Sequence, residues 1–206
     1  MGGQVDAEQS RLAMDSVYNI LNTKYGAILM DPPFHAHAID GALAVGYNAG
    51  TKENSGIFSQ TQGWLILAES LMGHGNRAFE YYMENCPAAF NDRAEIRQME
   101  PYCFGQSHVH WLTGTASTVM VGCVEGILGF RPDFGGLHIS PAIPAEWDGF
   151  EIEKEFRGKK LSIKVTNPEH KESGVKEILL NGSAMEGDYI PADQLKDENE
   201  IVVTLG

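Results

Sequence analysis

The hydrophobic pattern changes its period at Arg131-Pro132, and this change restricts the fold more than any other feature of the sequence. Before it, apolar residues recur at the spacing of amphipathic helices, between long loops rich in glycine and proline. After it, apolar and polar residues alternate as they do in half-buried strands. We therefore predict a mainly α fold with a β tail, divided into residues 1–130 and residues 131–206.

Four segments of the first part have helical spacing. The first begins after Asp6, a residue type that caps helices, and its pattern stops at Gly26. Residues 61–72 and 76–85 lie on either side of a glycine-rich turn and predict a helical hairpin. Small residues dominate the segment 114–128, which indicates a helix in a closely packed position.

Short alternating segments characterise the second part. They cover residues 150–156, 161–165 and 201–205. The pair Asn181-Gly182 follows an apolar run and is a strong signal for a two-residue hairpin turn. The tail is therefore predicted to be an antiparallel β-sheet module.

The charge excludes several classes of partner. With 28 acidic and 15 basic residues, the formal charge is −13, which repels nucleic acid and anionic lipid. The sequence has no apolar run near the roughly 20 residues of a membrane span and no basic and apolar leader. We expect no nucleic-acid or membrane partner and a cytoplasmic location. Three cysteines without C-x-x-C spacing indicate thiols rather than a disulfide framework or a zinc site.

The segment Thr113-Gly114-Thr115 stands at the start of the small-residue helix. A hydroxyl followed by a glycine at a helix start would present backbone N–H groups and the positive end of the helix dipole to an anion. The same residues also fit a simple N-cap with a glycine selected for packing. From the residues alone both interpretations stay open.

Two His-x-His pairs, His35/His37 and His108/His110, could in principle bind a metal, because alternating side chains of an extended segment point the same way. No cysteine or suitably spaced carboxylate accompanies them. We therefore interpret them as ordinary loop histidines and expect no metal site.

Several blocks of the sequence occur in the same order as in a known family. These blocks are Tyr25-Gly26, Asp31-Pro32-Pro33, Lys52-Glu53-Asn54-Ser55-Gly56-Ile57-Phe58, Gly75-Asn76-Arg77-Ala78-Phe79-Glu80-Tyr81-Tyr82, Glu100-Pro101-Tyr102, Gly105-Gln106, Trp111-Leu112-Thr113-Gly114-Thr115-Ala116, Ile127-Leu128-Gly129-Phe130-Arg131-Pro132, Pro141-Ala142-Ile143-Pro144, Trp147-Asp148-Gly149-Phe150 and Phe156-Arg157-Gly158. With them the chain resembles the cellobiose, cellobionic acid and chitobiose phosphorylases of glycoside hydrolase family ninety-four, from about Ala13 onward.

The resemblance implies an (α/α)6 barrel, of which residues 1–130 would be the C-terminal portion, followed by a β-sheet layer. It also implies reversible phosphorolysis of a β-linked disaccharide, with inversion to an α-sugar 1-phosphate. Phosphate takes the place that water has in an inverting hydrolase. Inorganic phosphate would be a co-substrate, the partners would be a disaccharide or a sugar 1-phosphate, and no other cofactor is expected.

The resemblance also implies roles for individual residues. Thr113 and Gly114 match the Thr-Gly pair that contacts phosphate, and Gln60 stands where the family usually has a phosphate-site histidine. A glutamine donates a neutral hydrogen bond but cannot carry the charge of an imidazolium.

Three further residues match loop positions that line the sugar sites of the family, namely Lys52, Glu53 and Gln106. The alternative for Lys52 and Glu53 is a solvated surface pair. Gln106 could instead bond to loop backbone groups.

The family's catalytic aspartate belongs to an upstream motif that does not occur here, and Asp148 lies in a different motif. We therefore expect no general acid in this chain. Two hypotheses follow: a part of a phosphorylase that is active only with an upstream portion, or a non-catalytic sugar-binding or structural fragment. A partial barrel would expose apolar helix faces, so self-association is also expected.

Overall fold

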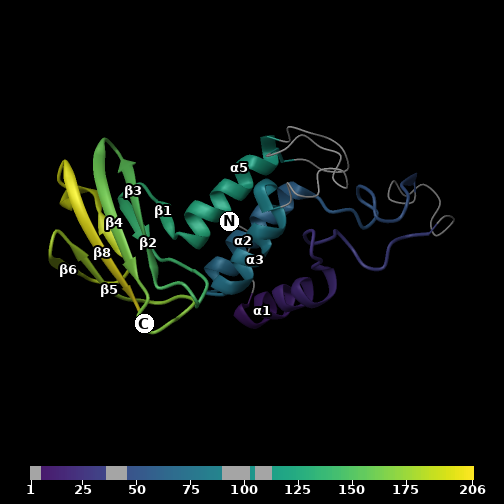
Figure 1. The fold of residues 1–206 in the computed structure, drawn as a ribbon, viewed down its shortest axis with the longest axis horizontal. Coiled ribbons are helices and arrows are strands. Elements are labelled where there is room, and N and C mark those ends of the chain that lie inside the picture. The colour runs from purple at the N-terminus through teal and green to yellow at the C-terminus, as the bar shows by residue number, and fades with distance from the viewer. Residues whose placement is uncertain (1–5, 36–45, 90–102, 105–112) are drawn as a thin grey trace. The chain divides into compact units, whose positions relative to one another are not determined.

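The computed structural model describes residues 6–35, 46–89, 103–104 and 113–206 (Figure 1). The chain divides into two compact units: Met1–Leu65 with Glu80–Met120, and Ile66–Phe79 with Val121–Gly206. The second unit contains the turn of a helical hairpin as well as all the strands of the two sheets. The domain division predicted after residue 130 stays a prediction.

Apart from the three-residue η5, the helices precede the strands along the chain, as the change of period predicted. The helical elements include α1 (Ala7–Ser16), η1 (Val17–Leu21), α2 (Ser59–Leu71), α3 (Gly75–Asn85), α5 (Thr113–Val121), η4 (Gly122–Ile127) and η5 (Ala192–Gln194). The strands are β1 (Phe130–Pro132), β2 (Gly136–Ile139), β3 (Gly149–Phe156), β4 (Lys159–Thr166), β5 (Val175–Leu180), β6 (Ser183–Met185), β7 (Tyr189–Pro191) and β8 (Glu198–Leu205).

The first helix begins where the sequence predicted and ends earlier. Asp6 caps α1 by accepting a hydrogen bond from the Glu8 backbone N–H at 3.0 Å. The last turn, η1, is π-helical, because the Asn22 N–H bonds to the carbonyl of Val17 five residues back. Asn22 then has extended backbone angles, so the helix stops at Leu21 rather than at Gly26.

The predicted helix over residues 114–128 is confirmed in position, but it has two parts. The α-helix α5 passes into the π-helical η4 at Gly122. A β-carbon on Gly126 would lie 2.8 Å from the Ser70 Oγ, so this glycine lets α2 approach η4 closely. Small residues in this segment therefore serve close packing, as their pattern indicated.

Two sheets make up most of the second unit. The larger has the strand order β3-β4-β8-β5-β6, and the smaller has the order β1-β2-β7 (Figure 1). The hairpin between β5 and β6 turns at Asn181 and Gly182, whose φ angles are 50° and 82°. Positive φ at both central residues is the geometry for which Asn-Gly is favoured, so the predicted turn is confirmed.

One strand pairing corrects the predicted antiparallel module. The last strand of the larger sheet, β8, runs parallel to β4, with Ile163 opposite Ile201. The chain between them forms β5, β6, β7 and η5, and this long connection lets β8 return in the direction of β4. The other pairs of both sheets are antiparallel, so the sheet is mixed.

Alternation along the strands produces the core of the second unit. In β4, β8 and the second half of β5, buried side chains alternate with exposed or half-buried ones. The residues buried in this way are Leu161, Ile163, Val165, Ile178, Leu180, Ile201, Val203 and Leu205. Phe130, Leu137, Ile139 and Ile190 of the smaller sheet are also fully buried.

The turn between α2 and α3 is fixed by the loop that precedes β3 and by the loop between β4 and β5. The Asn76 backbone N–H donates to the Glu172 carboxylate at 2.9 Å, and the Asn76 side-chain oxygen accepts from the Ala145 N–H at 3.0 Å. At Gly75 the two backbones nearly touch, since a β-carbon would lie 2.1 Å from the Ile143 carbonyl oxygen. The start of α3 therefore belongs structurally to the β-containing unit.

No helix in the described ranges is long and apolar enough to cross a membrane.

Replacing Gly75 with alanine should destabilise the chain. The added methyl group would overlap the backbone of Ile143, and overpacking of this kind costs about 1–3 kcal/mol or more. Urea unfolding followed by circular dichroism measures the change. The control is Gly46→Ala, where a β-carbon meets no described residue within 4 Å, and it should stay within about 0.5 kcal/mol of wild type. Equal midpoints for both variants would contradict the close approach.

Candidate functional site

The helices α2 and α5 contact each other backbone to backbone near their first turns. A β-carbon on Gly63 would lie 2.3 Å from the carbonyl carbon of Thr118 and 2.6 Å from the nitrogen of Val119. Any other residue at position 63 would push the helices apart. This contact sets how the two helix starts lie relative to each other.

Gln60 and Gly114 come together at these two helix starts. Each is the second residue of its helix, and each is exposed. The Gln60 amide carbon lies 3.4 Å, and its nitrogen 3.6 Å, from the point where a β-carbon on Gly114 would stand. The Thr118 hydroxyl lies 2.9 Å from the Gln60 carbonyl oxygen and donates to it. The structure thus joins two of the three predicted phosphate-site residues.

Two neighbouring helix N-termini favour the binding of an anion. The first backbone N–H groups of an α-helix have no partner within the helix, and the helix dipole adds partial positive charge there. Gln60 adds a side-chain amide that can donate to the same ligand. Thr113 is the first residue of α5, and its side chain lies outside the described part of the structure. This end of the two helices can therefore hold an anion without a cationic side chain.

Lys52 and Glu53 occupy an exposed turn in the loop before α2. Lys52 has a positive φ of 46°, and its carbonyl accepts a hydrogen bond from the Gly56 N–H at 2.9 Å. Its ammonium group lies 5.0 Å from the centre of the Tyr47 ring, within the range of a cation–π contact. Among the described residues, no hydrogen bond or ion pair joins this turn to Gln60, so its sugar-binding role stays a prediction.

Asn54 holds the same loop together from inside. Its side chain is fully buried and accepts a hydrogen bond from the Phe34 N–H at 2.7 Å. It also donates to the carbonyls of Phe34 and Tyr47, both at 2.9 Å. A second contact, from the Ser55 hydroxyl to the Met30 carbonyl, joins the loop to the same segment at 2.7 Å. The turn with Lys52 is thus attached to the segment 27–35.

Gln62 fixes that segment to α2. Its buried amide accepts from the Ala27 N–H at 2.8 Å and donates to the Ala27 carbonyl at 2.9 Å. This pairing copies the two bonds that a neighbouring strand would make. Gln62 and Asn54 gave no signal in the sequence, because a single polar residue in a loop does not reveal that it is buried.

The other predicted residues can be placed only in part. Gln106, His37, His108 and His110 lie outside the described residues, and His35 is exposed. Within the described ranges, no group of three or more histidine, cysteine or acidic side chains could hold a metal ion. The interpretation of the histidines therefore stays a prediction.

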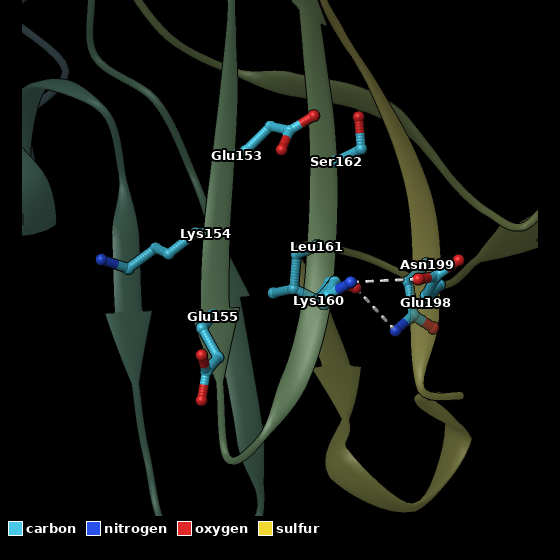
Figure 2. Close-up of a pocket in the computed structure, with 8 residues that line it drawn as sticks. All are labelled: Glu153, Lys154, Glu155, Lys160, Leu161, Ser162, Glu198 and Asn199. Atoms are coloured by element: carbon cyan, nitrogen blue, oxygen red, sulfur yellow. Dashed lines mark hydrogen bonds and ion pairs between the residues drawn. The ribbon is translucent and has the colours of Figure 1, made fainter.

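A separate depression of about 500 Å³ lies on β3, β4 and β8 in the second unit. Figure 2 shows its lining, in which the Lys160 ammonium pairs with the Glu198 carboxylate at 3.2 Å. Its lining residues are Glu153, Lys154, Glu155, Lys160, Leu161, Ser162, Glu198 and Asn199. Three carboxylates against two ammonium groups disfavour an anionic ligand, so this depression does not suit phosphate.

Family models match most of the chain. Residues 1–129 match the catalytic domain of the glycosyl hydrolase 94 superfamily. Residues 130–174 match the C-terminal domain of glycosyl hydrolase family 65.

Known proteins resemble the chain over nearly its whole length. It is 37% identical to an N,N'-diacetylchitobiose phosphorylase of Vibrio furnissii and 36% identical to one of Vibrio proteolyticus, each over 100% of this chain and 27% of the relative. A solabiose phosphorylase of Paenibacillus borealis is 25% identical over 93% of this chain and 26% of its own length. The chain therefore spans about a quarter of the length of these relatives.

Substituting Asn54 with aspartate should loosen the loops around the site. The change keeps the shape of the side chain but removes the donor to Phe34 and Tyr47 and places a charge in a fully buried position. Each unsatisfied buried group costs about 1–3 kcal/mol, so we expect a loss of at least 2 kcal/mol in urea unfolding. The matched control is Asn48→Asp in the same loop, where the residue is exposed and the loss should be below about 0.5 kcal/mol.

Proposed function

Because the chain belongs to the glycosyl hydrolase 94 superfamily, we propose that it is the C-terminal part of a disaccharide phosphorylase and supplies the phosphate-binding side of the active site. The observation that carries this proposal is the juxtaposition of Gln60 and Gly114 at two neighbouring helix starts. The named relatives support the reaction class, since they are disaccharide phosphorylases.

The proposed reaction is phosphorolysis with inversion. A phosphate oxygen forms a bond to the anomeric carbon while the glycosidic bond on the opposite face breaks, giving an α-sugar 1-phosphate. The leaving oxygen takes a proton from a general acid, which we assign to a portion of the enzyme upstream of this chain. Phosphate already carries negative charge, so this side of the site needs hydrogen-bond donors in place rather than a strong base.

Each residue has a proposed task. The N–H groups at the start of α5 and the Thr113 hydroxyl hold phosphate oxygens, and the Gln60 amide donates from α2. Lys52, Glu53 and Gln106 contact the sugar. Residues 1–130 would complete an (α/α)6 barrel together with the upstream portion, and residues 131–206 would form the β module beside it.

Exposed apolar side chains in the first unit support a missing partner surface. Trp64 and Met120 flank the contact at Gly63 and Thr118 in sequence, and they are 59% and 68% exposed. Ile20 is 58% exposed on η1. Contiguous apolar patches beyond a few hundred Å² are rare on monomers and drive association. We assign contacts with these exposed side chains to the upstream portion of the enzyme.

Replacing Gln60 with leucine should weaken phosphate use by the reconstituted enzyme. Loss of one hydrogen bond to a charged group is worth about 1.5–3 kcal/mol, which raises the KM for phosphate roughly 10- to 100-fold. The assay measures sugar 1-phosphate released from N,N'-diacetylchitobiose, cellobiose or cellobionic acid by the chain mixed with the upstream polypeptide. Gln60→His should keep or tighten phosphate binding, because an imidazolium adds charge.

The control for this assay is Gln194→Leu, the same change at an exposed position of η5. It should leave the KM for phosphate unchanged. An unchanged KM in Gln60→Leu would remove the phosphate role of Gln60. No product from the mixture on any of the substrates would favour the alternative, a non-catalytic sugar-binding or structural fragment.

The isolated chain should self-associate. Light scattering between about 10 and 500 μM should show a mass that rises with concentration, because the exposed apolar side chains are then buried between copies. The double variant Trp64→Gln, Met120→Gln should reduce this rise, whereas Gln194→Leu should not. A constant monomer mass for the wild-type chain would contradict the prediction.

A further inference from the structure

Two hydrogen bonds join η1, and the residue that follows it, to α3 within the first unit. The Tyr18 hydroxyl donates to the Glu80 carboxylate at 2.7 Å, and the Asn22 amide nitrogen donates to Glu84 Oε1 at 3.0 Å. On α3 the two acceptors, Glu80 and Glu84, are four residues apart and therefore lie one helical turn from each other. The ring of Tyr18 also meets the edge of the Tyr81 ring, with 6.2 Å between their centres.

The bond between Asn22 and Glu84 leaves one polar atom of each side chain without a partner. Asn22 Oδ1 and Glu84 Oε2 are both buried, and neither has a hydrogen-bond partner in the described part of the structure. Both atoms are acceptors when the carboxyl is ionised, so they cannot satisfy each other. Each side chain thus has one bonded and one unbonded atom. The pair therefore needs one more hydrogen-bond donor, and a proton on the carboxyl would supply it.

The environment of Glu84 favours the protonated form of its carboxyl group. Burial raises the pKa of Glu84 from 4.5 to about 7, against the hydrogen bond from Asn22, which lowers it. The neighbouring Glu80 carboxylate, one turn earlier on α3, raises it further. From η1 the facing groups are the neutral Tyr18 hydroxyl and the neutral Asn22 amide. None of the charges acting on Glu84 among the described residues is a basic side chain.

We propose that Glu84 is held as a neutral acid and donates its proton from Oε2 to Asn22 Oδ1, closing a two-bond lock between η1 and α3 that opens when the carboxyl ionises. An acid and a primary amide form two parallel hydrogen bonds in such a pair, one in each direction. Ionisation removes one bond and leaves two acceptors facing each other. The lock does not depend on the proposed phosphorylase function.

The lock holds the start of the segment that follows η1, and this segment contacts both α2 and the loop with Lys52. Asn22 is the first residue after η1, and the Ile28 N–H returns to the Leu21 carbonyl at 3.0 Å. The next residue back, Ala27, is held by Gln62 of α2. Ionisation of Glu84 therefore releases one end of the segment whose other contacts fix the loop with Lys52.

The free energy of unfolding should depend on the protonation of Glu84. The folded chain binds the proton more tightly than the unfolded chain, because the pKa of Glu84 is raised in the fold. The stabilisation is full below pH 4.5 and is lost as the pH rises through about 7. Within this window one proton changes the folding equilibrium by at most about tenfold per pH unit, and the partial exposure of Glu84 makes the change smaller.

Carbon-detected NMR of the glutamate carboxyl groups tests the proposal directly on the unmodified chain. The Glu84 signal, assigned through its own backbone resonances, should titrate near pH 7. The Ile28 amide should exchange faster above pH 7, after correction for the intrinsic effect of pH. A Glu84 midpoint near 4.5 would overturn the proposal.

The variant Glu84→Gln supplies the second test. A glutamine amide can donate to Asn22 Oδ1 and accept from Asn22 Nδ2 without titrating. The variant should therefore lose the part of the fall in urea midpoint between pH 5 and pH 8 that Glu84 is expected to cause in the wild type. The control Glu80→Gln should keep that fall and move it to lower pH, since it removes the neighbouring charge. An identical fall in wild type and Glu84→Gln would overturn the proposal.

Discussion

The backbone contact between α2 and α5 is the constraint on which the candidate site depends. Gly63 has no β-carbon, so the two helices meet at Thr118 without side chains between them. The contact lies about one turn from both helix starts, and this short distance fixes Gln60 beside Gly114. A longer separation would leave two independent helix ends. With the contact, the positive ends of two dipoles act on the same volume.

Buried amide side chains hold the long loops in place by hydrogen bonds to the backbone, as hydrogen bonds between strands hold the sheets. Asn54 and Gln62 replace the missing backbone partners of long loops, and each uses both its donor and its acceptor. Asn167 does the same in the second unit, where it bonds to the carbonyls of Trp147 and Lys171 and to the Lys171 N–H. An amide suits this task because it satisfies both kinds of backbone group. A carboxylate in the same place could only accept.

Local signals were predictable from the sequence, whereas contacts between distant residues were not. The cap at Asp6 and the turn at Asn181-Gly182 were predicted because each depends on the conformational preference of one or two residues. The parallel pairing of β8 with β4 and the burial of Asn54 against Phe34 depend on partners far along the chain. The pairing of Gln60 with Gly114 was expected only from the family resemblance, since 54 residues separate them and no local pattern joins them.

The position of β8 has a consequence for how the larger sheet can assemble during synthesis. In chain order β8 is the last strand of its sheet, yet in space it lies between β4 and β5. Until residues 198–205 leave the ribosome, the β3–β4 and β5–β6 hairpins have no strand to join them, and isolated two-stranded hairpins are marginal in water. Pairing across such sequence separations is also slow. A nascent chain would therefore carry two unjoined hairpins whose exposed edges can pair with other chains until β8 is made.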